Sequence, residues 1–392
     1  DANIKMTDKW LKTYRTYKRF FRTLLIINGC WYMPTKSGKL MYYWSICVFL
    51  SMIIITMISL HMSYIVRHNM KIMVKSGGVV LSGFGAIIKV LTFKINRDTL
   101  INYHLTLNDL FEKELMQNEK VQTMIFSSLR AISILTYIYF VFLIGIVVAY
   151  SKSSYTYIIQ NLLYFHLPTN YTLPLSKGFG WFWNVPDNFL YHIHMFYETV
   201  LMTLSCMMAC GVDSAFGFYV YQISSTIRAM MFALTNPLST EKFSDLLRTC
   251  AVKHQKLLQC RNTLEHVYGP IIFFHIGSNA VVLCFLIYDF TSLSVLNFEN
   301  ISVSVTYGGV KLLQTFIYTW YGTYLTNAGE EFRKGIYFSK WLNSNLDCHV
   351  RTNVILMMMQ KPMTINAVFS PVNVTMFTSV SIYYNSIKKK SE

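Results

Sequence analysis

Charged residues are scarce in this sequence. Aspartate, glutamate, lysine and arginine make up 14% of its 392 residues, whereas soluble proteins carry about 25%. Hydrophobic residues account for 53% and aromatic residues for 16%. The length alone would permit two or three soluble domains, but the shortage of charge indicates that lipid is the main solvent of the chain.

Acidic residues are the scarcer kind. The chain has 19 of them against 35 lysines and arginines, which gives a formal net charge of +16. Such an excess is also typical of nucleic-acid-binding proteins, because basic side chains neutralise phosphates. Here the basic residues lie between long apolar stretches, where they set the orientation of membrane helices. We therefore expect a lipid bilayer, and no nucleic acid, as a partner.

Recognisable catalytic motifs are missing. There is no Gly-x-Ser-x-Gly, no phosphate-binding loop and no His-Glu-x-x-His. Cys206 and Cys210 lie one helical turn apart without a second pair to complete a metal site, and His192 and His194 have no third ligand at metal spacing. We expect no enzyme, cofactor or metal. A membrane enzyme or transporter is a weaker alternative, since the sequence shows no paired repeat of broken helices.

Seven apolar stretches have, or approach, the length that crosses a bilayer. A hydrocarbon core about 30 Å thick requires about 20 residues of helix. The N-terminal residues are basic and amphipathic rather than a basic end before an apolar core, so insertion is expected to depend on these internal stretches. The second stretch contains four glycines, which we expect to be helix-packing positions. The seven are residues 41–60, 72–92, 131–150, 189–221, 270–288, 301–328 and 371–387.

The distribution of lysine and arginine orients the chain. With a cytoplasmic N-terminus, 24 of the 35 basic residues lie in cytoplasmic segments and eight in outer segments. The sequons at Asn170 and Asn300 fall in loops that this arrangement puts outside, so both are expected to carry glycans. The orientation is the reverse of that of a G-protein-coupled receptor, which makes that class the less favoured alternative. We expect an all-α membrane protein with seven transmembrane helices and a cytoplasmic N-terminus.

The last third of the chain carries specific motifs over about 65 residues. They are Leu312-Leu313-Gln314-Thr315-Phe316-Ile317-Tyr318, Gly322, Gly329-Glu330-Glu331, Ile336-Tyr337, Trp341, Leu356-Met357-Met358-Met359-Gln360-Lys361-Pro362, Ile365, Phe369, Pro371 and Phe377-Thr378. Together these motifs resemble the sixth span, the following cytoplasmic helix and the last span of insect odorant receptors.

The resemblance implies an odorant-binding subunit of a ligand-gated, non-selective cation channel. It further implies a heterotetramer with a common co-receptor subunit, in the plasma membrane of a sensory-neuron dendrite. The chain is similar to the ligand-tuned subunits, because residues 222–269 lack the long insertion of the co-receptor. A gustatory receptor of the same superfamily is the nearest alternative, but its final-span motif, Thr-Tyr followed by Gln-Phe, does not occur here.

The resemblance also divides the chain. Residues 1–40 are expected to be a cytoplasmic segment, 41–328 the first six spans, 329–362 a cytoplasmic anchor helix and 363–392 the pore-lining last helix with an outer C-terminus. The pore would be lined by Tyr383, Ile387 and Lys390, although the family's apolar gate falls where this chain has lysines. From the spacing of its apolar residues, the anchor helix needs a partner for one face, and we expect other subunits to cover it. That face consists of Ile336, Trp341, Leu342, Val350, Val354 and Met357.

The ligand of such a receptor would be a small, volatile or semi-volatile apolar molecule in the outer half of the bilayer. An apolar cavity with few polar groups suits it. Counting inward from the outer helix ends gives a set of residues that should overlap the pocket, although each alone could serve ordinary helix packing. The set is Val80, Phe84, Tyr139, Leu143, Val147, Met195, Phe196, Thr199, Met202, Tyr307, Gln314 and Tyr318.

Two ionisable residues lie at a similar depth inside the membrane. Glu198 and Lys311 are each nine to ten residues from the outer end of their span, about 14 Å deep. Buried ionisable groups usually face a cavity or a partner, so the two are predicted to pair beside the ligand cavity. The alternative is that each reaches back to the outer interface. Asp213 and Lys89 approach the inner interface, where we expect structural pairing.

Overall fold

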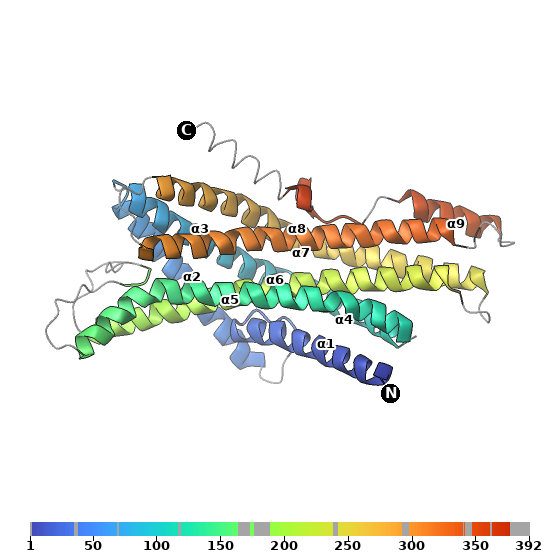
Figure 1. Cartoon of the computed structure of the whole chain (residues 1–392), viewed down its shortest axis with the longest axis horizontal. Coiled ribbons are helices and arrows are strands. Elements are labelled where there is room, and N and C mark those ends of the chain that lie inside the picture. The colour runs from blue at the N-terminus through green and yellow to red at the C-terminus, as the bar shows by residue number, and fades with distance from the viewer. Residues whose placement is uncertain are drawn as a thin grey trace.

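The protein is a bundle of long helices that run roughly along one axis (Figure 1). The computed structural model describes residues 2–34, 38–68, 70–116, 119–163, 173–175, 189–237, 242–291, 298–339, 341, 347–360 and 363–376. Its elements are α1 (Ala2–Ile27), α2 (Gly38–Ile65), α3 (Met70–Ile95), α4 (Arg97–Leu115), α5 (Glu119–Leu163), α6 (Phe189–Thr235), α7 (Phe243–Thr291), α8 (Phe298–Phe338), α9 (Cys348–Met359), β1 (Asn366–Ala367) and β2 (Ser370–Pro371).

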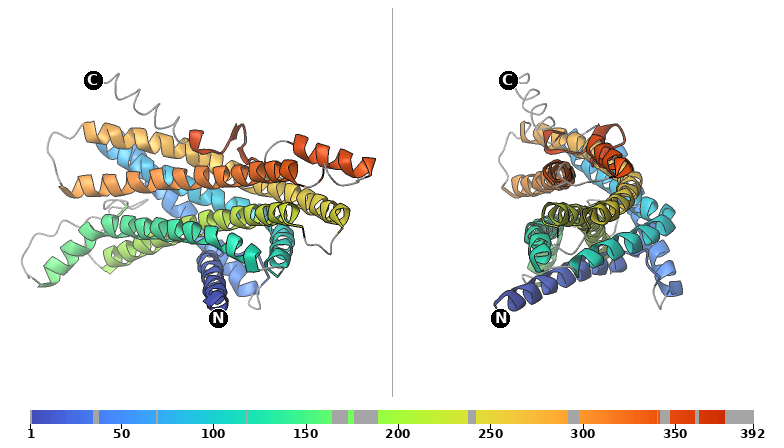
Figure 2. Two further views of the ribbon diagram at one scale, coloured as in Figure 1. Left: turned by 45° about the vertical axis from the view of Figure 1, so that its right-hand side comes forward. Right: turned by 90° about the vertical axis from the view of Figure 1, so that its right-hand side faces the viewer.

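The connections sort to two ends of the bundle. The adjoining ends of α2 and α3, of α5 and α6, and of α7 and α8 lie at one end, on the left in Figure 1, and α4, α9 and the adjoining ends of α6 and α7 lie at the other. Helix α1 packs across α5 and α6 (Figure 2). Its buried face includes Tyr17, whose hydroxyl lies 3.0 Å from that of Thr136 on α5 and donates to the Ser214 carbonyl on α6 at 3.2 Å. The helix ends thus form two groups, which match the segments that the charge distribution is expected to put outside and in the cytoplasm.

Five helices in the described part of the chain are long and apolar enough to cross a membrane. They overlap the first five predicted spans, at Leu40–Ile65, Ser76–Ile95, Lys120–Lys152, Phe189–Thr235 and Phe243–Tyr288. Helix α8 covers the predicted sixth span, but serines, threonines and glycines make its composition less apolar. The predicted seventh span lies mostly outside the described residues.

Helix α6 forms the centre of the bundle. Of its most apolar segment, 61% is buried inside the protein, against 33–44% for the other four. Close approach to α8 requires Gly217, since a Cβ atom there would lie 2.4 Å from the ring of Tyr321. The predicted glycine packing in α3 is also confirmed: a Cβ on Gly83 would lie 2.4 Å from Thr56 of α2, and one on Gly85 would lie 3.0 Å from His275 of α7.

The predicted anchor segment, residues 329–362, is divided between two helices. Helix α8 continues without a break to Phe338, and α9 follows at Cys348–Met359. The serine and asparagine residues between them favour a helix end, because their side chains compete for backbone hydrogen bonds. Accordingly, the Ser339 hydroxyl donates to the Ile336 carbonyl at 2.8 Å. Helix α9 ends at Met359, just before Lys361-Pro362, as the sequence predicted.

The apolar face expected to contact other subunits is partly covered within the chain. Ile336 and Val354 are buried, because α7 and α9 pack against the end of α8. The sequence did not predict this packing within the chain, because the start of α7 lies in a segment that was expected to connect two spans. Leu342 lies outside the described residues, and the side chain of Val350 is not described. Other apolar residues are exposed on the last turn of α8 and on α9, namely Tyr337, Phe338, Ile355, Leu356 and Met359.

A small hairpin lies at the start of the predicted seventh span. Strands β1 and β2 pair antiparallel through Asn366 with Pro371 and Ala367 with Ser370. The carboxylate of Glu265 on α7 accepts hydrogen bonds from the backbone and side chain of Asn366, both at 3.3 Å. These contacts attach the hairpin to the helical bundle.

Candidate functional site

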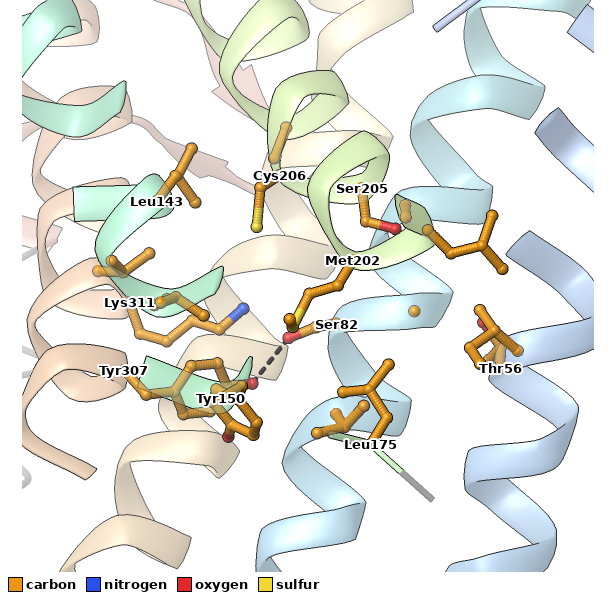
Figure 3. Close-up of a pocket in the computed structure, with 18 of the residues that line it drawn as sticks. Thr56, Ser82, Leu143, Tyr150, Leu175, Met202, Ser205, Cys206, Tyr307 and Lys311 are labelled. Carbon is orange, nitrogen blue, oxygen red and sulfur yellow. Dashed lines mark hydrogen bonds between the residues drawn. The ribbon is translucent and has the colours of Figure 1, made fainter. Parts of the chain in front are cut away.

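A cavity lies between α2, α3, α5, α6, α7 and α8 (Figure 3). Its volume is about 140 Å³. Leu175, from the link between α5 and α6, contributes to its wall, so the cavity lies toward the end of the bundle that carries that link. Under the charge-based orientation, this is the outer half.

Four helices each contribute one stripe of residues at helical spacing. Positions three and four residues apart share one face of a helix, so a stripe of this kind faces a common space. The stripes are Ser82, Ala86 and Lys89 on α3, Tyr139, Leu143, Ile146 and Tyr150 on α5, Met202, Ser205, Cys206 and Ala209 on α6, and Tyr307, Val310, Lys311 and Gln314 on α8.

The wall is mainly hydrocarbon, aromatic ring and sulfur, and several of its hydroxyl groups are already bonded. The Tyr307 hydroxyl donates to the Gly78 carbonyl at 2.8 Å and lies 2.7 Å from the Ser82 hydroxyl (Figure 3). Thr56 and Ser59 donate to carbonyls of their own helix at 2.7 and 2.9 Å. These groups therefore leave a largely apolar space, which suits a small apolar ligand.

A polar cluster around Asp213 lies beside the cavity. Oδ1 of Asp213 accepts from the Lys89 ammonium at 2.6 Å and from the Tyr318 hydroxyl. Oδ2 accepts from the Tyr139 hydroxyl at 2.9 Å and the Gln314 amide at 3.0 Å. The expected pairing of Lys89 with Asp213 is therefore confirmed, and both side chains are only 1% exposed. The cluster joins α3, α5, α6 and α8.

Lys311 lies in the same cavity, and no described carboxylate pairs with it. Among the described residues it forms no ion pair, and its ammonium lies 5.4 Å from the ring centroid of Tyr307. Its side chain reaches into the cavity with the nitrogen pointing toward Met202 (Figure 3). His275 also lines the cavity, and neither of its ring nitrogens has a hydrogen-bond partner in the described structure.

Glu198 and Lys311 are not brought together. Oε2 of Glu198 accepts the Leu175 backbone N–H at 2.8 Å, and Oε1 lies 3.2 Å from Nε2 of His194. Similar depth did not produce a pair, because residue counting gives the depth of a side chain but not the direction in which its helix turns it. Asp213 and Lys89 are the charges that meet.

The structure places the twelve predicted pocket residues in several environments. Tyr139, Leu143, Met202, Tyr307 and Gln314 line the cavity. Tyr318 lies beside it as a donor to Asp213, and Val80 and Val147 are buried elsewhere in the bundle. Met195 belongs to a small separate cluster with Leu173 and Tyr191, while Thr199 donates to the Met195 carbonyl. Phe84 and Phe196 are 38% and 65% exposed and face outward rather than into the cavity.

Some cavity residues were missed by the sequence reading. Ile146, Ser205, Cys206 and Ala209 lie on the stripes defined by residues that were chosen. Extending each stripe by one or two helical turns would have found them. Of the other predicted sites, Tyr383, Ile387, Lys390 and Asn170 lie outside the described residues, and Asn300 lies in the first turn of α8.

The comparisons with known proteins agree with this architecture. A sequence profile of the family described as "7tm Odorant receptor" matches residues 69–382. Odorant receptor 94a of Drosophila melanogaster is 23% identical over 235 residues, which is 59% of this chain and 57% of the relative. Odorant receptor 9a of the same species is 23% identical over 223 residues, 56% of this chain and 54% of that relative. The chain thus matches a little over half the length of these curated relatives.

Solved structures share the fold over the whole chain. The insect olfactory receptor OR5 from Machilis hrabei superposes with a TM-score of 0.77 and 15% identity, over 99% of this chain and 98% of that one. The same receptor in complex with eugenol gives a TM-score of 0.80 and 16% identity, over 98% and 100% of the two chains.

The fold and the cavity define an all-α membrane protein with an internal space of ligand size. The chain belongs to the 7tm odorant receptor family.

Proposed function

We propose that this chain is the odorant-binding subunit of a ligand-gated, non-selective cation channel that acts in smell, rather than an enzyme. The apolar cavity carries this proposal, because an apolar space about the size of a small organic molecule is what a volatile ligand requires. The structure of the Machilis hrabei receptor in complex with eugenol, which shares the fold of this chain, supports the proposal. The ligand would bind between α3, α5, α6 and α8 and act on the helices that enclose it.

The proposed location is the plasma membrane of a sensory-neuron dendrite, with the N-terminus in the cytoplasm. The excess of basic residues at the end that holds α1, α4 and α9 supports this orientation. A tag before Trp10 should be accessible only after permeabilisation, and Asn170 and Asn300 should accept glycans. Access to that tag on intact cells would reverse the orientation.

The proposed partner is a common co-receptor subunit in a heterotetramer. The exposed apolar residues of α8 and α9, Tyr337, Phe338, Ile355, Leu356 and Met359, support an intersubunit contact at the cytoplasmic end, because several large apolar side chains left exposed to water favour an interface. The pore would be formed by the residues after Phe377, with Tyr383, Ile387 and Lys390 along it.

The function is tested by recording odorant-evoked currents in cells that express the chain with and without the co-receptor. Currents in excised patches without nucleotides should persist, because the proposed gating is direct. Ala209→Phe, which fills the cavity, should abolish or strongly weaken the response while surface expression is retained. Val141→Phe is the matched control, since Val141 is 66% exposed on the same bundle and should leave the response unchanged. Equal responses of both variants would contradict the assignment of the cavity.

A further inference from the structure

The unusual feature of the cavity is a lysine that enters it and has no counter-ion among the residues that the structure describes. Lys311 is only 7% exposed and lies on the same face of α8 as Tyr307 and Gln314. Its interaction with the Tyr307 ring, at 5.4 Å, is a weak attraction compared with a hydrogen bond to an anion. A cation removed from water in this way favours a partner that carries negative charge or a strong acceptor.

The buried carboxylate beside the cavity, that of Asp213, cannot serve as that partner. Asp213 already accepts four hydrogen bonds, from Lys89, Tyr139, Gln314 and Tyr318. A carboxylate has about four lone-pair positions, so its capacity is used. Lys89 also balances its charge, so the two form a neutral pair. The cavity region formed by these groups therefore keeps one uncompensated positive charge, at Lys311.

We propose that the pocket selects a short-chain carboxylic acid, bound as its carboxylate by the ammonium of Lys311. This proposal rests on the proposed odorant-receptor function and names the ligand class of the same cavity. A carboxylate and an ammonium form a charge-assisted hydrogen bond, and removing water from the site strengthens it. The apolar chain of the acid lies against Leu143, Met202 and Val310. His275, whose ring nitrogens have no partner in the described structure, is a second group that can meet the carboxylate.

The size of the cavity limits the length of the acid. Its volume of about 140 Å³ is close to the about 150 Å³ of an engineered apolar cavity that binds benzene. An acid of about five carbons therefore fits, whereas a long-chain fatty acid does not.

Three ligands with the same carbon chain and different head groups test the proposal: pentanoic acid, 1-pentanol and pentylamine. Currents are recorded from the full chain expressed with the co-receptor, alongside a panel of neutral odorants. We expect the lowest half-maximal concentration for the acid and the weakest response to the amine, because the ammonium of Lys311 repels a second cation. Lys311→Met should raise the half-maximal concentration for pentanoic acid by about tenfold to a hundredfold, the range expected for a lost charge-assisted hydrogen bond.

Controls separate a ligand contact from a structural role. Lys311→Met should keep or improve the response to 1-pentanol, and the neutral Lys311→Gln should lose the acid response in the same way. Lys113→Met removes a positive charge from an exposed pair on α4, far from the cavity, and should change neither response. Surface expression is measured for each variant.

The possible failures differ from one another. A parallel loss of acid and alcohol responses in Lys311→Met would overturn the proposal, because it would indicate a structural role. An acid response that does not depend on Lys311 would also overturn the proposal. Wild-type currents evoked by neutral odorants but not by pentanoic acid would overturn it as well. In both of these cases the odorant-receptor function would stand. If no odorant evokes a current, the proposed function itself fails and the ligand class fails with it.

Discussion

The carboxylate of Asp213 should be the most sensitive polar position in the membrane part of this protein. Asp213→Asn leaves the Lys89 ammonium without its partner at a site where both side chains are 1% exposed. It also replaces an oxygen that accepts two hydrogen bonds with an amide that donates, so two of the four donors lose their acceptor. Breaking a buried pair by removing one partner costs about 3–5 kcal/mol.

Lys89→Met should be less harmful than Asp213→Asn. It removes one hydrogen bond and leaves a carboxylate that still accepts from Tyr139, Gln314 and Tyr318. The double variant Lys89→Met/Asp213→Asn removes both charges. Its loss of stability should be smaller than the sum of the two single losses by about 1 kcal/mol or more, since the residues are in direct contact.

Thermal unfolding of the purified protein in detergent provides the assay. The apparent melting temperature should fall by about 5 °C or more for Asp213→Asn, by less for Lys89→Met, and should partly recover in the double variant. Asp109→Asn makes the same chemical change in an exposed pair with Lys113, where the expected cost is below about 0.5 kcal/mol. Equal melting temperatures for Asp213→Asn and Asp109→Asn, or strictly additive losses, would refute this account of the cluster.

Two further predictions concern packing and pH. Gly217→Ala would place a Cβ atom 2.4 Å from the Tyr321 ring and should destabilise the protein by about 1–3 kcal/mol. Gly277→Ala, where a Cβ atom would have no neighbour within 4 Å, should not destabilise it. Similar melting temperatures for the two variants would contradict the packing of α6 on α8. Burial, with a smaller effect of the nearby Lys18 and Arg22, lowers the pKa of His104 on α4 to about 4 from its ordinary 6.5. The stability from its neutral ring is therefore complete above pH 6.5 and is lost as the pH falls toward 4. His104→Gln should make the melting temperature less dependent on pH between about 7 and 5, and an unchanged dependence would show that His104 is not the group responsible.

The amino-acid sequence by itself determined the class of this protein. Stretches such as residues 41–60 are too apolar and too long for anything but a membrane helix or a deeply buried one, and the transfer of apolar residues out of water depends on composition more than on neighbours. The end of α9 before Lys361-Pro362 was likewise readable, because proline restricts the residue that precedes it. The motifs near the C-terminus also indicated the family that the profile match identifies.

Only the tertiary structure decided which side chains meet. Glu198 and Lys311 have a similar depth, and their predicted pairing depended on that depth alone. The rotation of α6 about its own axis turns Glu198 toward Leu175 and His194. The rotation of α8 turns Lys311 into the cavity instead. The rotation of α6 also exposes Phe196 and places Cys206 on the cavity wall. Helix rotation is set by packing among several helices at once, including contacts such as Gly217 with Tyr321, which are distant in sequence. A single sequence gives the spacing along each helix but not the angle at which the helices face one another.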